Sequence, residues 1–237
     1  MGHPPLPPAP RISVVVPVLD EERRIGRQLA ALVASGAWHE VICVDGGSAD
    51  GTLAAARAVA GATVLSSPRG RAVQMNRGAA AATGDVLLFL HADVELPADA
   101  PERIATALAD PAVGGGAFRT WTVPDGRRTW LAPLLHLGDL RSRYSRLPYG
   151  DQAIFVRTAL FRRLGGFPEI ALMEDLAFSR ALSREARIRI VPAAVRVSGR
   201  RFLARPVYYF LLVNLMPLLV ALGVPPERLA RLYGNPR

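Results

Sequence analysis

Short apolar runs alternate with longer mixed stretches over the first 90 residues of the chain. Ile12–Val18 (ISVVVPV) is an almost unbroken β-branched run, which is typical of a strand buried on both faces of a parallel sheet. Val41–Val44, Thr63–Leu65 and Asp85–Leu90 predict three more strands. The stretches between them predict helices, the first from 20–22 to about Ala34, the others over 52–60 and 72–82. This alternation predicts an α/β fold with a mostly parallel sheet flanked by helices.

The pattern is looser after Asp93. Further helices are expected over Ala98–Ala109, Leu131–Tyr144, Arg157–Leu164 and Glu174–Ala186. Extended segments are expected over Ala112–Val123, with a break at Gly114–Gly116, over Gln152–Val156 and, briefly, over Ile188–Val191. No linker rich in Pro, Gly or Ser divides the chain, so we expect one domain over 11–201. It stands between a Pro-rich tail at 1–10 and a C-terminal apolar helical extension at 202–237.

The C-terminal extension raises the question of a membrane. Arg205 and Glu227 enclose 21 uncharged residues, which is close to the length of a spanning helix. Asn214 and Pro217 interrupt the run, and basic residues flank it upstream. A helix that lies on the membrane surface or packs against the domain is therefore favoured over a transmembrane helix. We expect peripheral contact with a membrane.

The charged residues exclude some kinds of catalysis and indicate the kind of partner. The chain has 29 basic and 20 acidic residues, a net charge of +9, and every basic residue is arginine. Without lysine there is neither a Schiff-base lysine nor a Walker phosphate loop. The positive charge favours anionic partners such as a phosphate-rich substrate or an acidic membrane surface. Nucleic acid is not an expected partner, because zinc-finger spacing and aromatic-plus-basic RNA-binding signatures are missing.

Cysteine usage and the N-terminus bear on location. The single cysteine, Cys43, excludes an internal disulfide and a multi-cysteine metal site. It lies in an apolar run, which predicts a buried thiol. Met1–Pro10 has no basic and apolar signal-peptide pattern. We therefore expect a cytoplasmic protein.

Acidic residues follow three of the predicted strands. Asp20 and Glu21 come after the first strand, Asp45 after the second and Asp93 after the fourth. In open parallel sheets, ligands bind outside the carboxyl ends of the strands. Taken singly, these residues have local roles as a helix cap, a turn former and a loop residue. Taken together, they predict a site that holds a cation or accepts hydrogen bonds from a base and ribose.

Several motifs carry a family resemblance. ISVVVPVLDEE, VDGGSADGT, the LHAD segment and MEDLAFSRAL occur in the order and spacing of family 2 glycosyltransferases with the GT-A fold. The resemblance runs from about Arg11 to Arg201 and implies a Rossmann-like, nucleotide-sugar-binding domain. GDQAIFVR (150–157), LGGFPE (164–169) and SGRRF (198–202) resemble the radical-SAM/selenodomain-associated transferase subgroup.

The resemblance implies a set of donor contacts. It places nucleotide-binding residues at Pro17, Leu19, Glu21, Asp45, Gly46, Gly47, Ser48, Arg71 and Asn76. Asp93 matches the last position of the family's D-x-D motif, whose carboxylates hold a divalent cation, Mn²⁺ or Mg²⁺, on the diphosphate. His91 stands at the first position of that motif. Imidazole suits Mn²⁺ better than Mg²⁺, so His91 is either a replacement ligand or a hydrogen-bonding, structural residue.

Asp175, preceded by Glu174, matches the catalytic base of the family. Its alternative role is that of a carboxylate that stabilises a helix N-terminus. Contacts to the diphosphate or the acceptor are expected from Asp151, Arg200 and Arg201. The resemblance thus implies an inverting, metal-dependent glycosyltransferase that moves a sugar from a nucleotide diphosphate sugar to an acceptor hydroxyl. The apolar extension suggests a lipid or membrane-proximal acceptor.

Two other classes stay open on the sequence alone. A nucleotidyltransferase of related fold usually begins with a Gly-rich loop carrying a basic residue, which VPVLDEE is not. A catalytically degenerate membrane-surface protein is the second alternative, because the first D-x-D aspartate is replaced. A dehydrogenase is disfavoured, since G-x-G-x-x-G is missing after the first strand.

Overall fold

The computed structural model describes residues 9–124, 136, 139, 142, 144, 147–200, 203 and 205–234. Of the helix expected over Leu131–Tyr144, only residues 136, 139, 142 and 144 are described, and these are helical. Arg201 and most of the Pro-rich tail lie outside the described residues.

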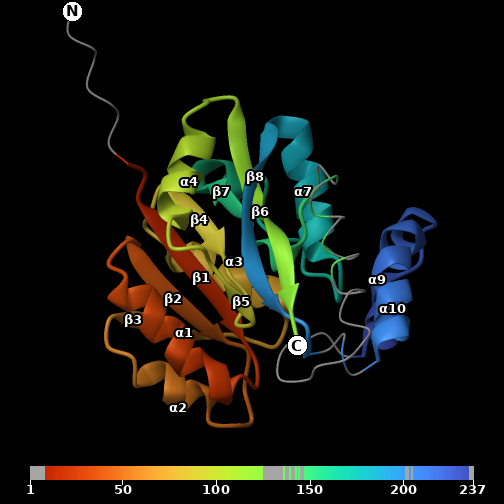
Figure 1. Cartoon of the computed structure of the whole chain (residues 1–237), viewed down its shortest axis with the longest axis horizontal. Helices are drawn as coiled ribbons and strands as arrows, with labels where there is room; N and C mark the ends of the chain where they lie inside the picture. The colour runs from red at the N-terminus through yellow and green to blue at the C-terminus, as the bar shows by residue number, and fades with distance from the viewer. Residues whose placement is uncertain are drawn as a thin grey trace, which may run out of the picture.

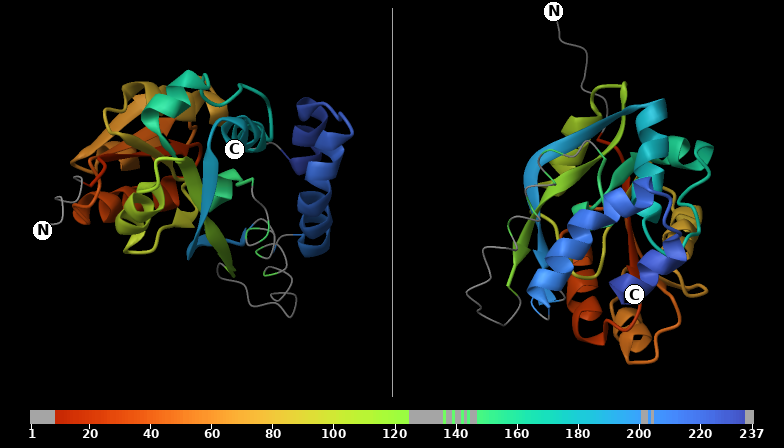
Figure 2. Two further views of the ribbon diagram at one scale, coloured as in Figure 1. Left: turned by 90° about the horizontal axis from the view of Figure 1, so that it is seen from above. Right: turned by 90° about the vertical axis from the view of Figure 1, so that its right-hand side faces the viewer.

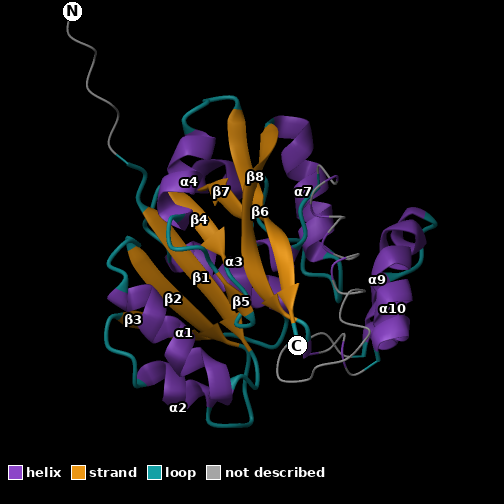
Figure 3. Cartoon of the chain, in the orientation of Figure 1, coloured by secondary structure: helices purple, strands orange, loops and turns teal. Residues whose placement is uncertain are grey.

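A single sheet organises the described chain (Figures 1 and 3). Its strands are β1 (Ile12–Val18), β2 (Glu40–Asp45), β3 (Ala62–Ser66), β4 (Val86–Phe89), β5 (Val94–Glu95), β6 (Val113–Val123), β7 (Phe155–Arg157) and β8 (Arg187–Ser198). Their order in the sheet is β3-β2-β1-β4-β7-β6-β8-β5. The helices are α1 (Glu22–Ala34), α2 (Thr52–Arg57), α3 (Arg71–Ala81), α4 (Ala100–Leu108), the 3₁₀ turn η1 (Gly150–Gln152), α6 (Thr158–Arg163), α7 (Glu174–Glu185), α9 (Pro206–Ala221) and α10 (Pro226–Tyr233).

Strand β1 lies in the middle of the parallel half of the sheet. It pairs in parallel with β2 and β4, and β2 pairs in parallel with β3. Helices α1, α2 and α4 contribute to the core on one face, and α3, α6 and α7 to the core on the other. All seven residues of β1 are therefore buried, as its unbroken apolar run predicts.

The sheet as a whole is mixed: the parallel pairings of the expected sheet are joined by antiparallel ones. Strand β7 is antiparallel to β4 and to β6, and β5 is antiparallel to β8. Strand β8 runs from Arg187 to Ser198, far beyond the short strand expected at Ile188–Val191. Its residues alternate between charged or small and apolar, and it is held by its parallel pairing with β6. The local sequence of β8 does not predict this pairing, because β6 is distant in the chain.

The three glycines at Gly114–Gly116 do not break β6, contrary to expectation. They allow the neighbouring strands to approach. A Cβ on Gly116 would lie 2.2 Å from the carbonyl oxygen of Arg189 on β8, and one on Gly115 would lie 2.6 Å from that of Phe155 on β7. Only glycine fits between these two backbones.

The C-terminal helices form a small cluster of their own. Leu212 and Met216 of α9 pack with Leu229 of α10 and with Leu172, which precedes α7. Figure 2 shows the pair of helices on the α7 side of the molecule. Of the helices in the described ranges, none combines the length and the apolar character needed to cross a membrane.

Two helical glycines provide a matched test of the packing. A Cβ on Gly78 of α3 would lie 2.4 Å from Cγ1 of Val15 in β1, whereas one on Gly26 of α1 would meet Ala55 at an ordinary 3.5 Å. Alanine gains up to about 1 kcal/mol over glycine in a helix. We expect Gly26→Ala to raise the free energy of unfolding by up to about that amount, and Gly78→Ala to lower it by about 1–3 kcal/mol because of overpacking. Urea denaturation measures both; equal effects of the two substitutions would contradict the packing described here.

Candidate functional site

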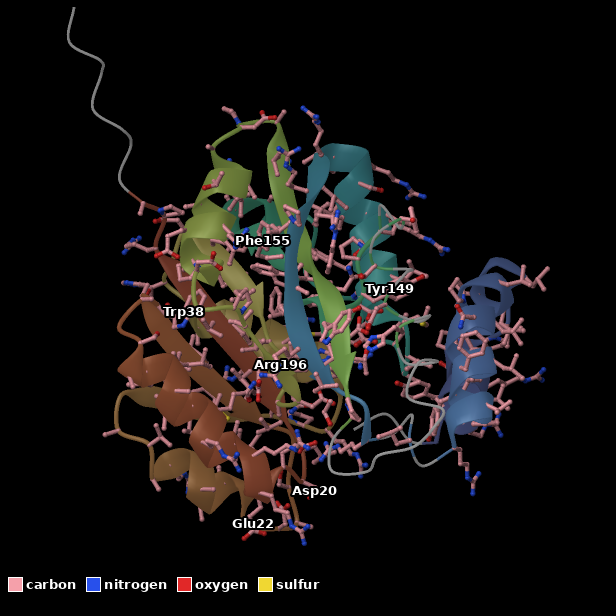
Figure 4. All side chains as sticks on the ribbon, viewed as in Figure 1. Asp20, Glu22, Trp38, Tyr149, Phe155 and Arg196 are labelled. Carbon is pink, nitrogen blue, oxygen red and sulfur yellow. The ribbon has the colours of Figure 1, made fainter. Side chains whose placement is uncertain are left out.

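A cavity of about 280 Å³ opens at the carboxyl ends of β1 and β4. It is lined by eight of the residues that the sequence singles out: Pro17, Leu19, Glu21, Arg71, His91, Asp93, Asp151 and Asp175. Tyr149, labelled in Figure 4, precedes η1 and lines the same cavity. Helices α9 and α10 complete the wall with Tyr209, Phe210, Asn214, Met216 and Tyr233. The strand-end residues thus meet at one place, as parallel strands require.

Asp175 lies in the first turn of α7 and is 7% exposed. Its Oδ2 accepts a hydrogen bond of 2.6 Å from the backbone N–H of Gly150, and its Oδ1 accepts one of 2.7 Å from the N–H of Leu176. Burial and the nearby charge of Glu174 raise the pKa of Asp175 to about 6, against the lowering effects of Arg71 and of the two N–H groups. Asp175 lies both at the N-terminus of a helix and in the cavity. Its position is therefore compatible with both expected roles, the helix-stabilising carboxylate and the catalytic base.

An ion pair between Arg71 and Glu174 joins the first residues of α3 and α7. Glu174 is 1% exposed. Its burial favours the neutral acid, but the charge and hydrogen bond of Arg71 outweigh burial and hold the pKa of Glu174 below its usual range. The pKa of the Arg71 guanidinium is raised, because its attraction to Glu174 outweighs desolvation. The pair is therefore ionised and places a negative charge beside Asp175.

Gln74, which the sequence does not single out, is a buried residue of the cavity lining. Its side-chain Nε2 donates to the carbonyl oxygens of Val18, at 2.6 Å, and Val44, at 2.9 Å. One buried amide therefore ties the ends of β1 and β2 together. The sequence spacing could have indicated Gln74 as a site residue: it follows Arg71 by three residues, so both lie on the same side of α3.

The residues at the end of β2 do not line the cavity. The carboxylate of Asp45 accepts the N–H groups of Gly47 and Ser48 at 3.1–3.3 Å and the hydroxyl of Ser48 at 2.5 Å. Asp45 is the register partner of Val18, a cavity residue. A Cβ on Gly46 would lie 2.8 Å from Cδ of Gln74. The DGGS turn is thus built against Gln74, one strand away from the cavity.

Asn76 is also outside the cavity lining. Its Nδ2 donates to the carbonyl oxygen of Phe167 at 2.8 Å, and its Oδ1 accepts the N–H of the same residue at 2.9 Å. The amide therefore holds the turn after α6 against α3, in a structural role.

Arg200 forms an ion pair with Glu21. The side chain of Glu21 is 10% exposed and that of Arg200 is 31% exposed. This pair connects the segment that follows β1 with the segment that follows β8. The guanidinium that was expected to contact phosphate is thus held beside the cavity by a carboxylate.

The cavity lining contains a further carboxylate, Asp139, that the motifs missed. Asp139 is buried and accepts hydrogen bonds from the backbone N–H and the hydroxyl of Thr122, at 2.9 and 2.8 Å. The Nδ1 atom of His136 lies 3.1 Å from the same carboxylate. Asp139 and Thr122 both line the cavity. They join the end of β6 to the segment that follows it.

His91 and Asp93 follow β4 and line the cavity near Asp175. A Cβ on Gly150 would lie 2.7 Å from Cε1 of His91 and 3.2 Å from Oδ2 of Asp175, so the ring and the carboxylate border the same glycine. Within the described ranges, no three His, Cys, Asp or Glu side chains group closely enough to hold an ion by themselves. Mg²⁺ and related cations are usually bound by one or two carboxylates together with substrate phosphates and water. The single carboxylate of Asp93 fits a cation that binds together with a phosphate-bearing ligand.

The raised pKa of Asp175 has a consequence for stability. A carboxyl with a folded pKa of about 6 against 3.8 stabilises the folded state fully below pH 4, and that contribution is lost as the pH rises through 6. At about 1.4 kcal/mol for each pH unit, the loss is roughly 3 kcal/mol. We therefore expect the free energy of unfolding of the wild type, relative to Asp175→Asn, to fall by about 2–3 kcal/mol between pH 4 and pH 7 in urea denaturation.

Asp85→Asn is the matched control for this measurement. The hydrogen bonds from Arg11 hold the pKa of Asp85 below its usual range, so here the wild type gains stability over the variant as the pH rises through the acid range. A difference between the wild type and Asp175→Asn that stays flat from pH 4 to pH 7 would contradict the buried environment described for Asp175.

Comparison with known proteins bears on the whole arrangement. A transferase from Klebsiella pneumoniae, the undecaprenyl-phosphate 4-deoxy-4-formamido-L-arabinose transferase, is 26% identical over 247 aligned positions. These cover 97% of this chain and 72% of the relative. The structure of a mannosyltransferase from Pyrobaculum calidifontis in complex with GDP-Man and Mn²⁺ superposes with a TM-score of 0.61 and 25% identity, over 79% of this chain. TarS 1–349 of S. aureus in complex with UDP-GlcNAc superposes with a TM-score of 0.61 and 21% identity, also over 79%.

The chain spans 56% and 58% of the lengths of these two solved proteins. Their likeness supports the expected GT-A-like fold, with a curled mixed sheet between helices. The family model described as glycosyl transferase family 2 matches residues 13–165, from β1 to just past α6. Because that match covers most of the chain and all four strands of the parallel half, the protein belongs to glycosyl transferase family 2 and is a glycosyltransferase.

Proposed function

We propose that this protein is an inverting, metal-dependent glycosyltransferase that moves a sugar from a nucleotide diphosphate sugar to a hydroxyl of its acceptor. The observation that carries the proposal is the position of Asp175. It is a buried carboxyl with a pKa near 6, in the same cavity as the residues that follow β1 and β4. At neutral pH it is ionised and can accept a proton, which suits a general base.

The donor is proposed to lie along the carboxyl ends of β1 and β4. Pro17, Leu19, Glu21 and Arg71 line the cavity. The first three are proposed to contact the base and Arg71 the diphosphate or the sugar. Asp45, Gly46, Gly47, Ser48 and Asn76 are proposed to shape this side of the site, in keeping with their hydrogen bonds. The complexes of the mannosyltransferase with GDP-Man and of TarS with UDP-GlcNAc support a nucleotide sugar as donor.

A divalent cation, Mn²⁺ or Mg²⁺, would be held by Asp93, with His91 as a second ligand or as its hydrogen-bonding neighbour. Such an ion stabilises the negative charge that develops on the departing diphosphate. The Mn²⁺ of the mannosyltransferase complex supports this choice. Asp151 and Arg200, beside the same cavity, are proposed to position the diphosphate or the acceptor.

The proposed reaction is one displacement. The acceptor oxygen bonds to the anomeric carbon while the bond from that carbon to the diphosphate oxygen breaks. The hydroxyl proton passes to Asp175, and the nucleoside diphosphate leaves with the bonding electrons. A single displacement inverts the anomeric configuration, so one base suffices. Glu174 takes no proton here; its charge, neutralised in part by Arg71, keeps Asp175 basic enough to accept one.

The acceptor is proposed to be a lipid or a membrane-proximal molecule that carries a hydroxyl group. The apolar side chains of Phe210 and Met216 in the cavity wall support this choice. The Klebsiella relative, whose name refers to undecaprenyl phosphate, supports it as well. We further propose that the protein is cytoplasmic and lies on the inner face of the cell membrane. We also propose that it belongs to the radical-SAM/selenodomain-associated transferase subgroup.

Calorimetric titration with nucleotides tests the donor site. UDP, GDP, dTDP and CDP are each titrated with and without Mn²⁺ into the wild type and Asp93→Ala. We expect one diphosphate to bind in a metal-dependent way, and Asp93→Ala to weaken that binding by roughly tenfold or more, because the carboxylate that holds the ion is lost. Asp99→Ala removes an exposed carboxylate paired with Arg103, and it is expected to bind as the wild type does.

Two results would count against the proposal. One is a folded wild-type protein that binds none of the four nucleotides, which would favour a catalytically degenerate protein. The other is binding that is equal in Asp93→Ala and the wild type and indifferent to Mn²⁺.

A further inference from the structure

Helix α9 carries a row of exposed apolar side chains. Val207, Tyr208, Leu211, Leu215, Leu218 and the C-cap residue Leu222 are each 42–71% exposed. They follow one another at spacings of three or four residues, apart from the adjacent pair at the start, so they lie along one side of the helix. We call this row the apolar stripe. Contiguous exposed apolar surface of this kind marks an interaction site.

Helix α9 is packed against the rest of the protein on the side opposite the apolar stripe. On that side, Leu212 and Met216 are buried against Leu229 and Leu172. Tyr208 is further anchored by its hydroxyl, which donates to the carbonyl oxygen of Leu232 on α10 at 2.6 Å. Helix α9 is therefore held in one orientation with the stripe turned outward.

The charges around the apolar stripe indicate which kind of partner binds it. Arg205 precedes α9 and is exposed, and the bond from Tyr208 to Leu232 brings the end of α10, with the exposed Arg231, to the same end of the stripe. From residue 205 to 234 the sequence has three arginines and a single acidic residue, Glu227. A second copy of a chain with a net charge of +9 would be repelled. An anionic lipid surface attracts basic residues and accommodates apolar side chains below its headgroups.

We propose that the apolar stripe of α9, with Arg205 and Arg231 at its end, docks this protein on an anionic phospholipid bilayer, with α9 lying in the plane of the interface. The same helix contributes Tyr209, Phe210 and Asn214 to the wall of the cavity. Docking therefore brings one wall of the cavity to the lipid surface. The docking surface rests on the membrane location in the proposed function and not on the proposed sugar transfer. Its test measures vesicle binding, so docking and sugar transfer can fail separately.

Vesicle co-sedimentation tests the proposal. The purified chain is mixed with vesicles of phosphatidylcholine alone or of equal parts phosphatidylcholine and phosphatidylglycerol. The wild type is expected to sediment with the anionic vesicles and less with the neutral ones. Leu211→Gln/Leu218→Gln leaves the charge unchanged and is expected to weaken binding by roughly tenfold or more, because two apolar side chains are lost from the stripe.

Two control variants separate the apolar and the ionic contributions. Ala30→Gln/Ala31→Gln alters exposed positions of α1, away from the stripe, and is expected to bind as the wild type does. Arg205→Gln/Arg231→Gln is expected to weaken binding to anionic vesicles by about fivefold per arginine. Arg23→Gln/Arg27→Gln removes the same charge from the exposed side of α1 and is expected to have a much smaller effect.

Three results would overturn the proposal. The first is a wild-type protein that stays in the supernatant with anionic vesicles. The second is a leucine double variant that binds as tightly as the wild type, with circular dichroism confirming that both are folded. The third is a dimer, seen by light scattering, that the leucine substitutions dissociate, because the stripe would then be covered by a second copy.

Discussion

The site depends on three ionisable side chains that meet where α3 and α7 begin: the buried carboxylates of Glu174 and Asp175 and the half-buried guanidinium of Arg71. Removing a charge from water is costly unless a partner of opposite sign is close. Arg71 is that partner for Glu174, and the pair stays ionised. Among the residues that the structure describes, Asp175 has no ion-pair partner of its own; it has two backbone N–H donors and a neighbouring negative charge. That difference gives two adjacent carboxylates opposite pKa shifts, a condition suited to proton transfer.

The rest of the structure keeps this cluster in front of the strand ends. Helices α3 and α7 pack on the same face of the sheet and share one core. The close packing of Gly78 on Val15 brings α3 near β1, and the amide of Gln74 then holds the ends of β1 and β2. Since the ion pair spans the first residues of both helices, a change in how α3 sits on the sheet would move Asp175 as well.

The sequence predicts the parallel half of the fold well, because buried β-branched runs and regular acidic strand ends are local signals. Strand β5, the full length of β8 and the antiparallel pairing of β7 escape that reasoning, since these pairings join segments that are distant in the chain. The same limit applies to the site. Arg71 and Glu174 are 103 residues apart, so their ion pair has no sequence pattern. The family resemblance implies a nucleotide contact for Asn76, yet the structure shows its amide bonded to the backbone of Phe167.

The pH dependence of sugar transfer tests the central role of Asp175 most directly. With the donor that the protein binds, kcat/KM of the wild type should rise with pH through an apparent pKa near 6, as the carboxyl of Asp175 ionises. Glu174→Gln should move this rise to lower pH, because the charge of Glu174 helps to raise the pKa of Asp175. Asp175→Asn should lose the rise together with most of the activity. A variant Asp175→Asn that keeps both the rate and the pH profile of the wild type would contradict this account.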